Sequence, residues 1–279
     1  MKKIFSLLVA ALFLFAACDK IDEDKYIVFS GAAGTWYDSE VEIPQVQRAF
    51  VEKYTGVRCQ NCPKGDQVIH TAMEKYGDRL VVAAVHVPNN FSRPFSGQPD
   101  LRTDKGSEWF NAFFSPSQGI PAALLNRQKV NGSLDIINPT GGFDDKIDAV
   151  VNNNPTVSMF METGNEGENS FADVHIRFDQ TVAEPLTLTL LVVEDKIYTT
   201  QTSGNEEIEN YEQNHVLRAI ITDTWGIDVD ADGQQGTKRM VRLSYQLPET
   251  CNSENCHLIA FVSNKNTREI LNSVQCDVL

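Results

Sequence analysis

Basic residues are scarce in this sequence and form no cluster. Lys and Arg number 24 against 38 Asp and Glu, which gives a net charge of −14. Contact with phosphates needs clustered Lys and Arg, so this composition argues against a nucleic acid as a partner. Internal repeats and low-complexity tracts are also absent, and the apolar content of 42% is ordinary for a globular protein. The length of 279 residues suggests two domains.

Cys and His residues placed to bind zinc are few as well. A structural zinc site needs about four Cys or His ligands. Cys59-x-x-Cys62 is followed by neither a second Cys-x-x-Cys nor a His-x-x-x-His pair. The histidines are scattered, and each is predicted to be structural: His70, His86, His175, His215 and His257. We therefore expect neither a zinc site nor a cofactor.

The long apolar run of this sequence lies at its amino terminus. Residues 4–15 follow two lysines and are too short a run to span a bilayer comfortably, which predicts a signal peptide over residues 1–17. The small residues before Cys18 resemble a bacterial lipobox, in which that Cys becomes the acylated first residue of the mature protein. Phe15 stands where Leu is usual. The alternative is an ordinary signal peptide with an incidental Cys18.

Lipid on Cys18 would give the protein a stable membrane anchor, because it supplies more than the two hydrophobic signals required. Residues 19–25 are acidic and polar, and we interpret residues 18–44 as a tether and N-terminal extension. The acidic run resembles signals that send some Gram-negative lipoproteins to the outer face of the outer membrane. The sequence leaves a periplasmic and a surface-facing orientation both open. Export also favours disulfides, which persist beyond the inner membrane.

A Cys-x-x-Cys pair, Cys59 and Cys62, lies between an apolar run at residues 48–54 and a helical pattern at residues 65–76. A second apolar run at residues 80–87 predicts another buried strand. The order strand, Cys-x-x-Cys, helix, strand is the opening of a thioredoxin-like unit. Two interpretations of the pair stay open: a reversible disulfide, and a fixed structural bridge.

The position of the pair has chemical consequences. A thiol at a helix N-terminus feels exposed N–H groups and the positive end of the dipole, and Arg58 adds a cation. Both effects should lower the pKa of Cys59 below the free-thiol value of about 8.5. Cys62 lies one turn further in, so we expect it to be more buried and to stay protonated longer. Pro63 suits a first helical turn.

Pro121 is the third candidate residue of this site. Gly119-Ile120-Pro121 precedes an apolar strand and resembles the cis-proline that faces the Cys-x-x-Cys in thioredoxin-like folds. The alternative is an ordinary trans-proline at a strand start. Helices are predicted at residues 107–114 and 140–152. We assign residues 45–153 to the α/β thioredoxin-like domain.

The remaining residues, 154–279, read almost wholly as strands and predict an all-β, immunoglobulin-like sandwich. In the strand at 186–194, for example, Leu186, Leu188 and Leu190 alternate with Thr187 and Thr189. The predicted strands cover residues 156–163, 171–178, 186–194, 215–222, 239–247, 257–263 and 268–276.

Two smaller features of this half leave alternatives open. Asp228, Asp230 and Asp232 match the first half of a calcium loop, but the twelfth position is Arg239, so an acidic surface loop is the competing interpretation. Three cysteines follow, an odd number that leaves one thiol over unless chains pair: Cys251, Cys256 and Cys276. We expect the hairpin at 257–276 to bring Cys256 opposite Cys276, with Cys251–Cys256 as the competing bridge.

The chain resembles Gram-negative outer-membrane lipoproteins related to the twenty-eight-kilodalton outer membrane protein. The residues that carry this resemblance are Glu52-Lys53-Tyr54-Thr55-Gly56, Cys59-x-x-Cys62-Pro63, Ile120-Pro121-Ala122 with Asn126-Arg127, His215-Val216-Leu217-Arg218-Ala219 with Thr224-Trp225-Gly226, and Asn255-Cys256-His257-Leu258-Ile259-Ala260-Phe261-Val262. It covers nearly the whole mature chain. It implies a thioredoxin-like domain, then a β-sandwich, on an outer-membrane lipid anchor, and adhesion has been suggested for the family.

The broader resemblance to thioredoxins implies roles for single residues. Cys59 would be the attacking thiol, Cys62 the resolving thiol, and Pro121 the platform for a substrate peptide. The chain departs from thioredoxins at Arg58, where they place Trp, and at Gln60-Asn61, where they place Gly-Pro. Glu52 lies near their buried carboxylate but out of register with it. Two functions remain: a thiol–disulfide oxidoreductase of the envelope with protein thiol or disulfide clients, or a non-enzymatic adhesin or binding module.

Overall fold

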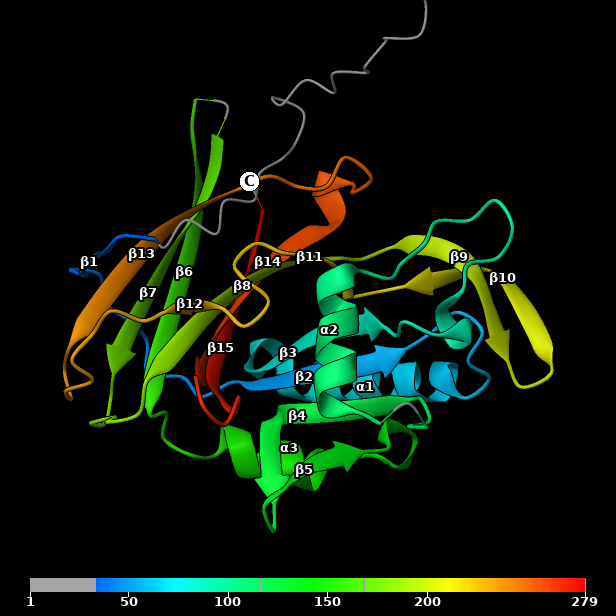
Figure 1. Ribbon diagram of the computed structural model, residues 1–279, viewed down its shortest axis with the longest axis horizontal. Helices are drawn as coiled ribbons and strands as arrows, with labels where there is room; N and C mark the ends of the chain where they lie inside the picture. The colour runs from blue at the N-terminus through cyan, green and yellow to red at the C-terminus, as the bar shows by residue number, and fades with distance from the viewer. Residues whose placement is uncertain (1–33, 116, 168, 279) are drawn as a thin grey trace, which may run out of the picture. The chain divides into compact units, whose positions relative to one another are not determined.

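The computed structural model describes residues 34–115, 117–167 and 169–278, which are rich in β-structure with few helices (Figure 1). The strands form a sheet of nine, a sheet of four and a separate two-stranded hairpin. Among these residues, no helix is both long and apolar enough to cross a membrane. The signal peptide, Cys18 and the acidic run after it lie outside the described residues.

The nine-stranded sheet runs in the order β15-β14-β8-β11-β3-β2-β4-β5, with β12 paired to β8. Its strands are β2 (Ala49–Thr55), β3 (Leu80–His86), β4 (Ala122–Val130), β5 (Ser133–Ile137), β8 (Leu186–Glu194), β11 (Val216–Ile220), β12 (Ile227–Asp228), β14 (Cys256–Asn264) and β15 (Ile270–Asp277). Strand β3 is parallel to β2 on one side and to β11 on the other, and the other pairings are antiparallel.

This sheet continues across the boundary predicted at residues 153–154. Strands from both sides of it pair where β3 meets β11. The described residues accordingly belong to one compact unit. The division of the sequence into two domains stays a prediction, but the two stretches share one sheet in the folded protein.

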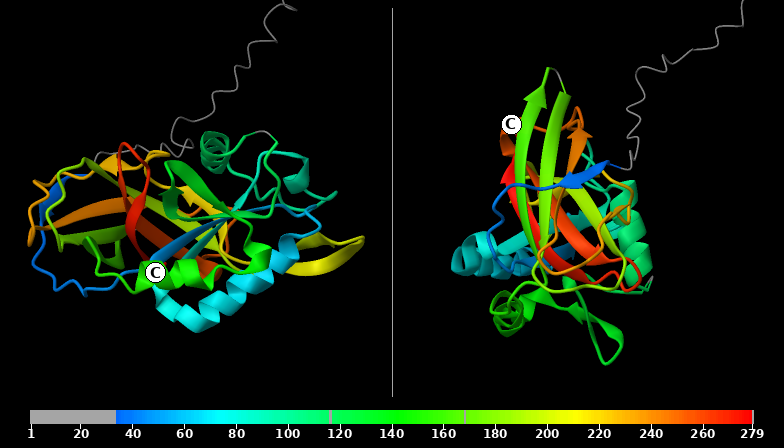
Figure 2. Two further views of the ribbon diagram at one scale, coloured as in Figure 1. Left: turned by 90° about the horizontal axis from the view of Figure 1, so that it is seen from below. Right: turned by 90° about the vertical axis from the view of Figure 1, so that its left-hand side faces the viewer.

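Helices cover both faces of the part of the sheet that carries β2, β3 and β4. Helices α1 (Cys62–Tyr76) and α3 (Asp144–Val151) pack on one face and α2 (Asp104–Phe113) on the other, as the right-hand view of Figure 2 shows for α1 and α2. The alternation of β2 explains this: Val51 joins the α1 side, whereas Phe50 and Tyr54 join the α2 side. A strand covered on both faces is apolar throughout. Among the described residues, four 3₁₀ turns lie in the connections between helices and strands: Gly77–Arg79, Asn90–Ser92, Pro139–Gly141 and Ser253–Asn255.

The four-stranded sheet packs against β8 and β14 to form a sandwich. It contains β1 (Trp36–Asp38), β13 (Lys238–Tyr245), β7 (Asn169–Phe178) and β6 (Val157–Glu166), all antiparallel. Leu188 and Leu190 of β8 join its core, whereas Leu191 and Val193 face the side of α2. The predicted strand character of the carboxyl-terminal half is thus confirmed. One face of β8 packs against the four-stranded sheet, and its other face lies on the side of α2.

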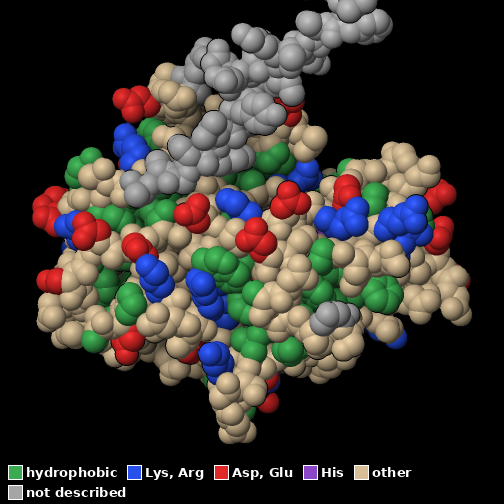
Figure 3. Space-filling view, viewed as in Figure 1, with side chains coloured by type: hydrophobic (Ala, Val, Ile, Leu, Met, Phe, Trp, Pro, Cys, Tyr) green, Lys and Arg blue, Asp and Glu red, His purple; other side chains and the backbone are tan. Residues whose placement is uncertain are grey.

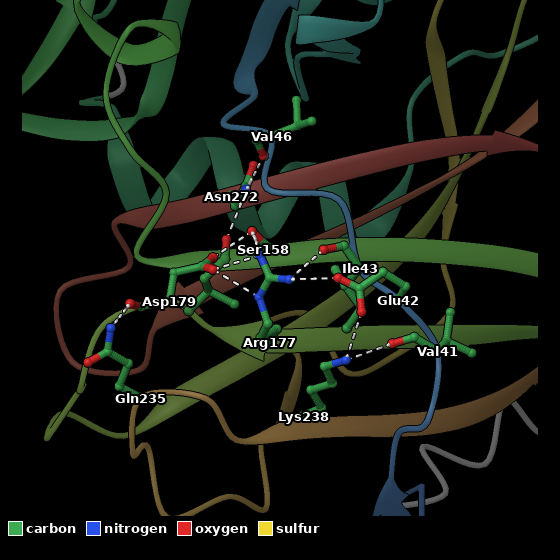
Figure 4. Close-up of polar contacts among 11 residues, drawn as sticks. Val41, Glu42, Ile43, Val46, Ser158, Arg177, Asp179, Gln235, Lys238 and Asn272 are labelled. Carbon is green, nitrogen blue, oxygen red and sulfur yellow. Dashed lines mark hydrogen bonds and ion pairs between the residues drawn. The ribbon is translucent and has the colours of Figure 1, made fainter.

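The segment before β2 is folded onto this sandwich rather than extended as a tether. Ile43 is completely buried, and its carbonyl accepts a hydrogen bond of 2.7 Å from Arg177 (Figure 4). Glu42 pairs with both Arg177 and Lys238. The described part of the predicted N-terminal extension is therefore structured.

Candidate thiol–disulfide site

Cys59 and Cys62 form a disulfide in the turn between β2 and α1, with their Cα atoms 5.4 Å apart. Cys62 is the first residue of α1, Pro63 follows it, and Asn61 is the N-cap. The predicted placement at a strand-to-helix turn is confirmed. Cys62 thus lies at the helix N-terminus, where the first backbone N–H groups have no partner within the helix.

The chain before the disulfide is held by the segment at residues 91–95. A Cβ on Gly56 would meet the carbonyl oxygen of Phe91 at 2.4 Å, so only glycine fits there. The Arg58 guanidinium bonds the carbonyl of Arg93 at 2.8 Å and lies 3.9 Å above the ring of Phe95. The cation predicted beside Cys59 is therefore fixed by the neighbouring loop.

A hairpin from the carboxyl-terminal half is hydrogen-bonded to the turn that carries the disulfide, at the end of the sheet where β2 ends (Figure 1). It consists of β9 (Ile197–Ser203) and β10 (Glu206–Gln213). Gln201 donates to the carbonyls of Cys59 at 3.1 Å and Gly56 at 3.3 Å. The backbone of the hairpin adds two hydrogen bonds, from the N–H of Thr202 to the carbonyl of Val57 and from the N–H of Gly204 to the carbonyl of Gln60. We name β9 and β10 the cover hairpin.

Both cysteines are buried beneath this cover. Cys59 is 2% exposed and Cys62 1% exposed, so the expected contrast between an open and a buried thiol is absent from the oxidised form. The sequence analysis did not predict the cover hairpin. Ser203-Gly204 between two runs with β-branched residues is a hairpin signal that was available in the sequence.

A buried ion pair ties the sheet, helix α1 and the cover hairpin together. Lys53 on β2 contacts one oxygen of Asp66 on α1 at 2.5 Å. Tyr211 on β10 donates to the other oxygen at 2.8 Å. Burial, and then the charge of Asp66, raise the pKa of Tyr211 well above its usual value, so the phenol stays a donor.

Pro121 opens onto a groove beside the disulfide. The Ile120–Pro121 peptide bond is cis, as predicted. The groove has a volume of about 460 Å³ and is lined by Pro121 together with Asn61, which precedes Cys62, and Lys64 of α1. A Cβ on Gly65 would contact the Pro121 ring at 3.4 Å, so α1 and the start of β4 are close neighbours. The structure thus brings all three predicted residues of the site to one end of the sheet.

A second buried ion pair lies behind the site and was missed by the sequence analysis. Arg127 donates to Glu52 through two hydrogen bonds of 2.8 and 2.7 Å, and the two side chains are 2% and 0% exposed. Four aromatic rings surround the guanidinium, with centroids 4.6 to 5.9 Å from Cζ: Trp109, Phe113, Trp225 and Phe261. Positive φ angles at Asn126 and Arg127 interrupt the regular course of β4 there.

His86 provides a pH-dependent contribution to stability next to the site. It is 2% exposed, and neither ring nitrogen has a hydrogen-bond partner among the described residues. Burial, with a smaller effect of Lys53, lowers the pKa of His86 to about 3. The unfolded chain therefore binds more protons than the folded one between that value and about 6.5.

We expect the free energy of unfolding to fall as the pH drops from about 6.5 toward 3, by on the order of 1 kcal/mol for each pH unit from this group. Urea unfolding at several pH values measures the slope. His86→Leu should flatten it, whereas the exposed His70 gives a matched control in His70→Leu. Equal slopes in the two variants would contradict the assignment.

Comparison with known proteins decides the family. Residues 110–278, which are 169 of the 279, match the family described as outer membrane protein Omp28. The chain belongs to the Omp28 family. Membership confirms the predicted relationship to outer-membrane lipoproteins and places the protein in the outer membrane. Among curated proteins, none matches the chain by sequence.

Solved structures are similar to this Omp28-family chain in fold. HBP35 of Porphyromonas gingivalis has 18% identity and a TM-score of 0.65, over 85% of this chain and 76% of that one. Protein AGR_C_4864 from Agrobacterium tumefaciens has 15% identity and a TM-score of 0.51, over 83% and 95%. A domain of the outer membrane lipoprotein Omp28 from P. gingivalis has 16% identity and a TM-score of 0.31, over 44% and 88%.

Calcium binding at the loop considered for this Omp28-family chain stays a prediction, and the structure shows what its three aspartates contact. Asp228 pairs with Lys265 at 2.6 Å, and Asp230 lies 3.7 Å from Arg239. Asp232 accepts hydrogen bonds from Gln234 and Thr237 within its own loop. The three carboxylates have separate partners, and the cluster suited to a metal among the described residues does not include them.

The favoured bridge between Cys256 and Cys276 was wrong. The register of β14 and β15 places Cys276 opposite Leu258, two residues further along β14. Three thiols are free among the described residues, namely Cys251, Cys256 and Cys276, and the thiol near Cys256 is that of Cys251. The predicted hairpin is present, but its register differs from the expected one by two residues.

Proposed function

We propose that this Omp28-family protein is a thiol–disulfide oxidoreductase of the cell envelope, held to the outer membrane by lipid on Cys18. The observation that carries the proposal is the Cys59–Cys62 disulfide at the start of α1, beside the groove that Pro121 lines. The order β2, disulfide, α1, β3, α2, β4, β5, α3 supports a thioredoxin-like unit within residues 45–153. We propose an immunoglobulin-like sandwich for the rest.

The reaction would proceed by two exchanges. The Cys59 thiolate attacks one sulfur of a client disulfide, which forms a mixed disulfide and releases the client's other thiolate. The thiolate of Cys62 then attacks Cys59 Sγ and releases the client's second thiolate. The client gains two electrons and two protons, and the Cys59–Cys62 disulfide is restored.

Trapping of clients tests this function. In Cys62→Ser the second exchange is lost, so mixed disulfides with protein clients should accumulate on Cys59. Cys59→Ser should trap few. Trapping by Cys59→Ser instead would reverse the two roles, and trapping by neither variant would reject the reaction.

The burial of both sulfurs supports the second candidate, a binding module with a structural bridge. That candidate predicts no trapped clients and binding that survives replacement of both cysteines by serine. Under the oxidoreductase proposal, the cover hairpin must move before a client reaches Cys59. Access to the thiol is then limited by the contacts that hold the cover.

Gln201→Ala should loosen the cover, because it removes the side-chain bonds to the carbonyls of Cys59 and Gly56. At about 1 kcal/mol for each bond, alkylation of the reduced Cys59 by iodoacetamide should speed up about tenfold or more. Glu207→Ala on the exposed side of the same hairpin is the matched control and should leave the rate unchanged. An unchanged rate in Gln201→Ala would show that the side chain does not limit access.

The lipid anchor has its own test. Cys18→Ser removes the sulfur that would carry the diacylglycerol, so the variant should leave the membrane pellet and take up no labelled palmitate. The unchanged chain should stay in the membrane pellet and take up the label. Palmitate that still enters the Cys18→Ser protein would reject Cys18 as the attachment site.

A further inference from the structure

A second pair of neighbouring thiols lies in the sandwich, outside the site described above. Cys251 Sγ, Cys256 Sγ and a carboxylate oxygen of Glu194 lie within 4.8 Å of one another. Cys256 begins β14 and is buried, whereas Cys251 lies in the preceding loop and is partly exposed. The short turn Ser253–Asn255 folds the loop back and brings the two thiols together.

Surrounding contacts hold this arrangement in place. Glu194 accepts a 2.7 Å hydrogen bond from the backbone N–H of Asn252, between the two cysteines. Its other oxygen pairs with Arg218 at 2.8 Å, and Arg218 also donates to Thr250. The loop that carries Cys251 is therefore fastened on both sides of that residue, which keeps its thiol beside Cys256.

Cys276 is a poorer partner for Cys256, although both belong to the same hairpin. The residue opposite Cys276 is Leu258, so Cys256 is its diagonal neighbour. Diagonal neighbours across strands are about 7–8 Å apart, beyond the usual Cα separation of a disulfide. The register leaves Cys276 as a single thiol.

A metal ion is also a poorer occupant than a covalent bond. Both oxygens of Glu194 already have partners, and one of these is the guanidinium of Arg218. A cation bound to the two sulfurs and Glu194 would compete with that positive charge. The two thiols need no third ligand to form a disulfide.

We propose that Cys251 and Cys256 are a second dithiol centre, which closes to a disulfide on exchange with small or protein disulfides. The more exposed Cys251 takes the incoming sulfur as a mixed disulfide, and one thiolate leaves. Cys256 Sγ then attacks Cys251 Sγ, and the second thiolate leaves. The two cysteines lose two electrons and two protons, and the incoming disulfide is reduced to two thiols.

The new centre acts independently of Cys59–Cys62. A row of residues that are paired on neighbouring strands crosses the sheet from Lys53 through Ala84, Val216 and Glu194 to Cys256. At about 4.8 Å for each of four strand spacings, Cys256 is roughly 19 Å from Lys53. Cys59 lies beyond the end of β2, so the two centres cannot exchange directly. The inference does not rest on the proposed function.

The test uses the full chain, purified in detergent, fully reduced and then incubated with oxidised glutathione. N-ethylmaleimide blocks the remaining thiols, and mass spectrometry of the unreduced digest locates the bonds. We expect a Cys251–Cys256 link with Cys276 outside it. Cys276→Ser should leave the link unchanged, and Cys251→Ser should leave Cys256 unlinked. The double variant Cys59→Ser/Cys62→Ser should form the link to the same extent as the unchanged chain.

Three results would overturn the proposal. The first is alkylation of both Cys251 and Cys256 under conditions that oxidise Cys59–Cys62. The second is a link from either residue to Cys276, or loss of the link in the double variant. The third is one zinc ion per chain in the purified protein that disappears in Cys256→Ser.

Discussion

In a chain whose Cys251 and Cys256 are replaced by serine, so that the second thiol pair cannot contribute, Cys59→Ser should reduce the disulfide-reducing activity to the background rate of the reductant alone. A serine hydroxyl cannot replace the thiolate that attacks the client disulfide. A fluorogenic disulfide of glutathione, with the protein as catalyst, measures the rate. Cys62→Ser should retain a single fast exchange and then stop as a mixed disulfide.

Cys276→Ser is the matched control for this experiment, since Cys276 is a single thiol on β15 in the sandwich. Burial raises the pKa of Cys276 to about 12, so it is a poor nucleophile at neutral pH. Its variant should be as active as the unchanged chain. Activity that survives in Cys59→Ser would remove the oxidoreductase from consideration.

Arg127→Ala should lower the free energy of unfolding by about 3–5 kcal/mol, because it leaves a buried carboxylate without its partner. Glu52 is completely buried and accepts hydrogen bonds from two nitrogens of Arg127, Nε and Nη2. The substitution also empties the space between the surrounding aromatic rings. Urea unfolding gives the change, and thermal unfolding provides a second measurement for a variant that is too unstable for urea.

Two comparisons separate burial from bonding in this prediction. Arg102 makes the same kind of paired contact with Asp100, but the two side chains are 34% and 44% exposed. Arg102→Ala should therefore cost less than about 1 kcal/mol. The double variant Glu52→Leu/Arg127→Met should recover much of the loss, since no unpaired charge remains. Equal costs for Arg127→Ala and Arg102→Ala would contradict this expectation.

The parts of the fold that were predicted depend on local patterns. The apolar runs of β2 and β3, the helical pattern of α1 and the alternation in β8 are visible over a few residues. Cys59, Cys62 and Pro121 could be named because their residue types have specific chemistry at that spacing. The structure bears out the disulfide and the cis peptide bond, while their catalytic use stays a prediction.

The parts that were missed depend on contacts between distant residues. Gln201 reaches the Cys59 carbonyl across 142 positions, and no pattern near either residue indicates this contact. Glu52 and Arg127 are 75 positions apart, and their burial depends on the aromatic side chains that surround them. A helix was expected to begin at residue 140, but Gly142, with φ of 77°, separates the turn Pro139–Gly141 from α3. Local signals located the elements but not their partners.

The pairing of β3 with β11 restricts how this architecture can be inherited. If residues 45–153 were transferred alone to another protein, β3 would lose its neighbour and present an open strand edge. Exposed edges of this kind promote association with other chains. The redox turn would also lose the hairpin that covers it. The two halves are therefore expected to be gained or lost together, as one genetic unit, rather than exchanged as modules.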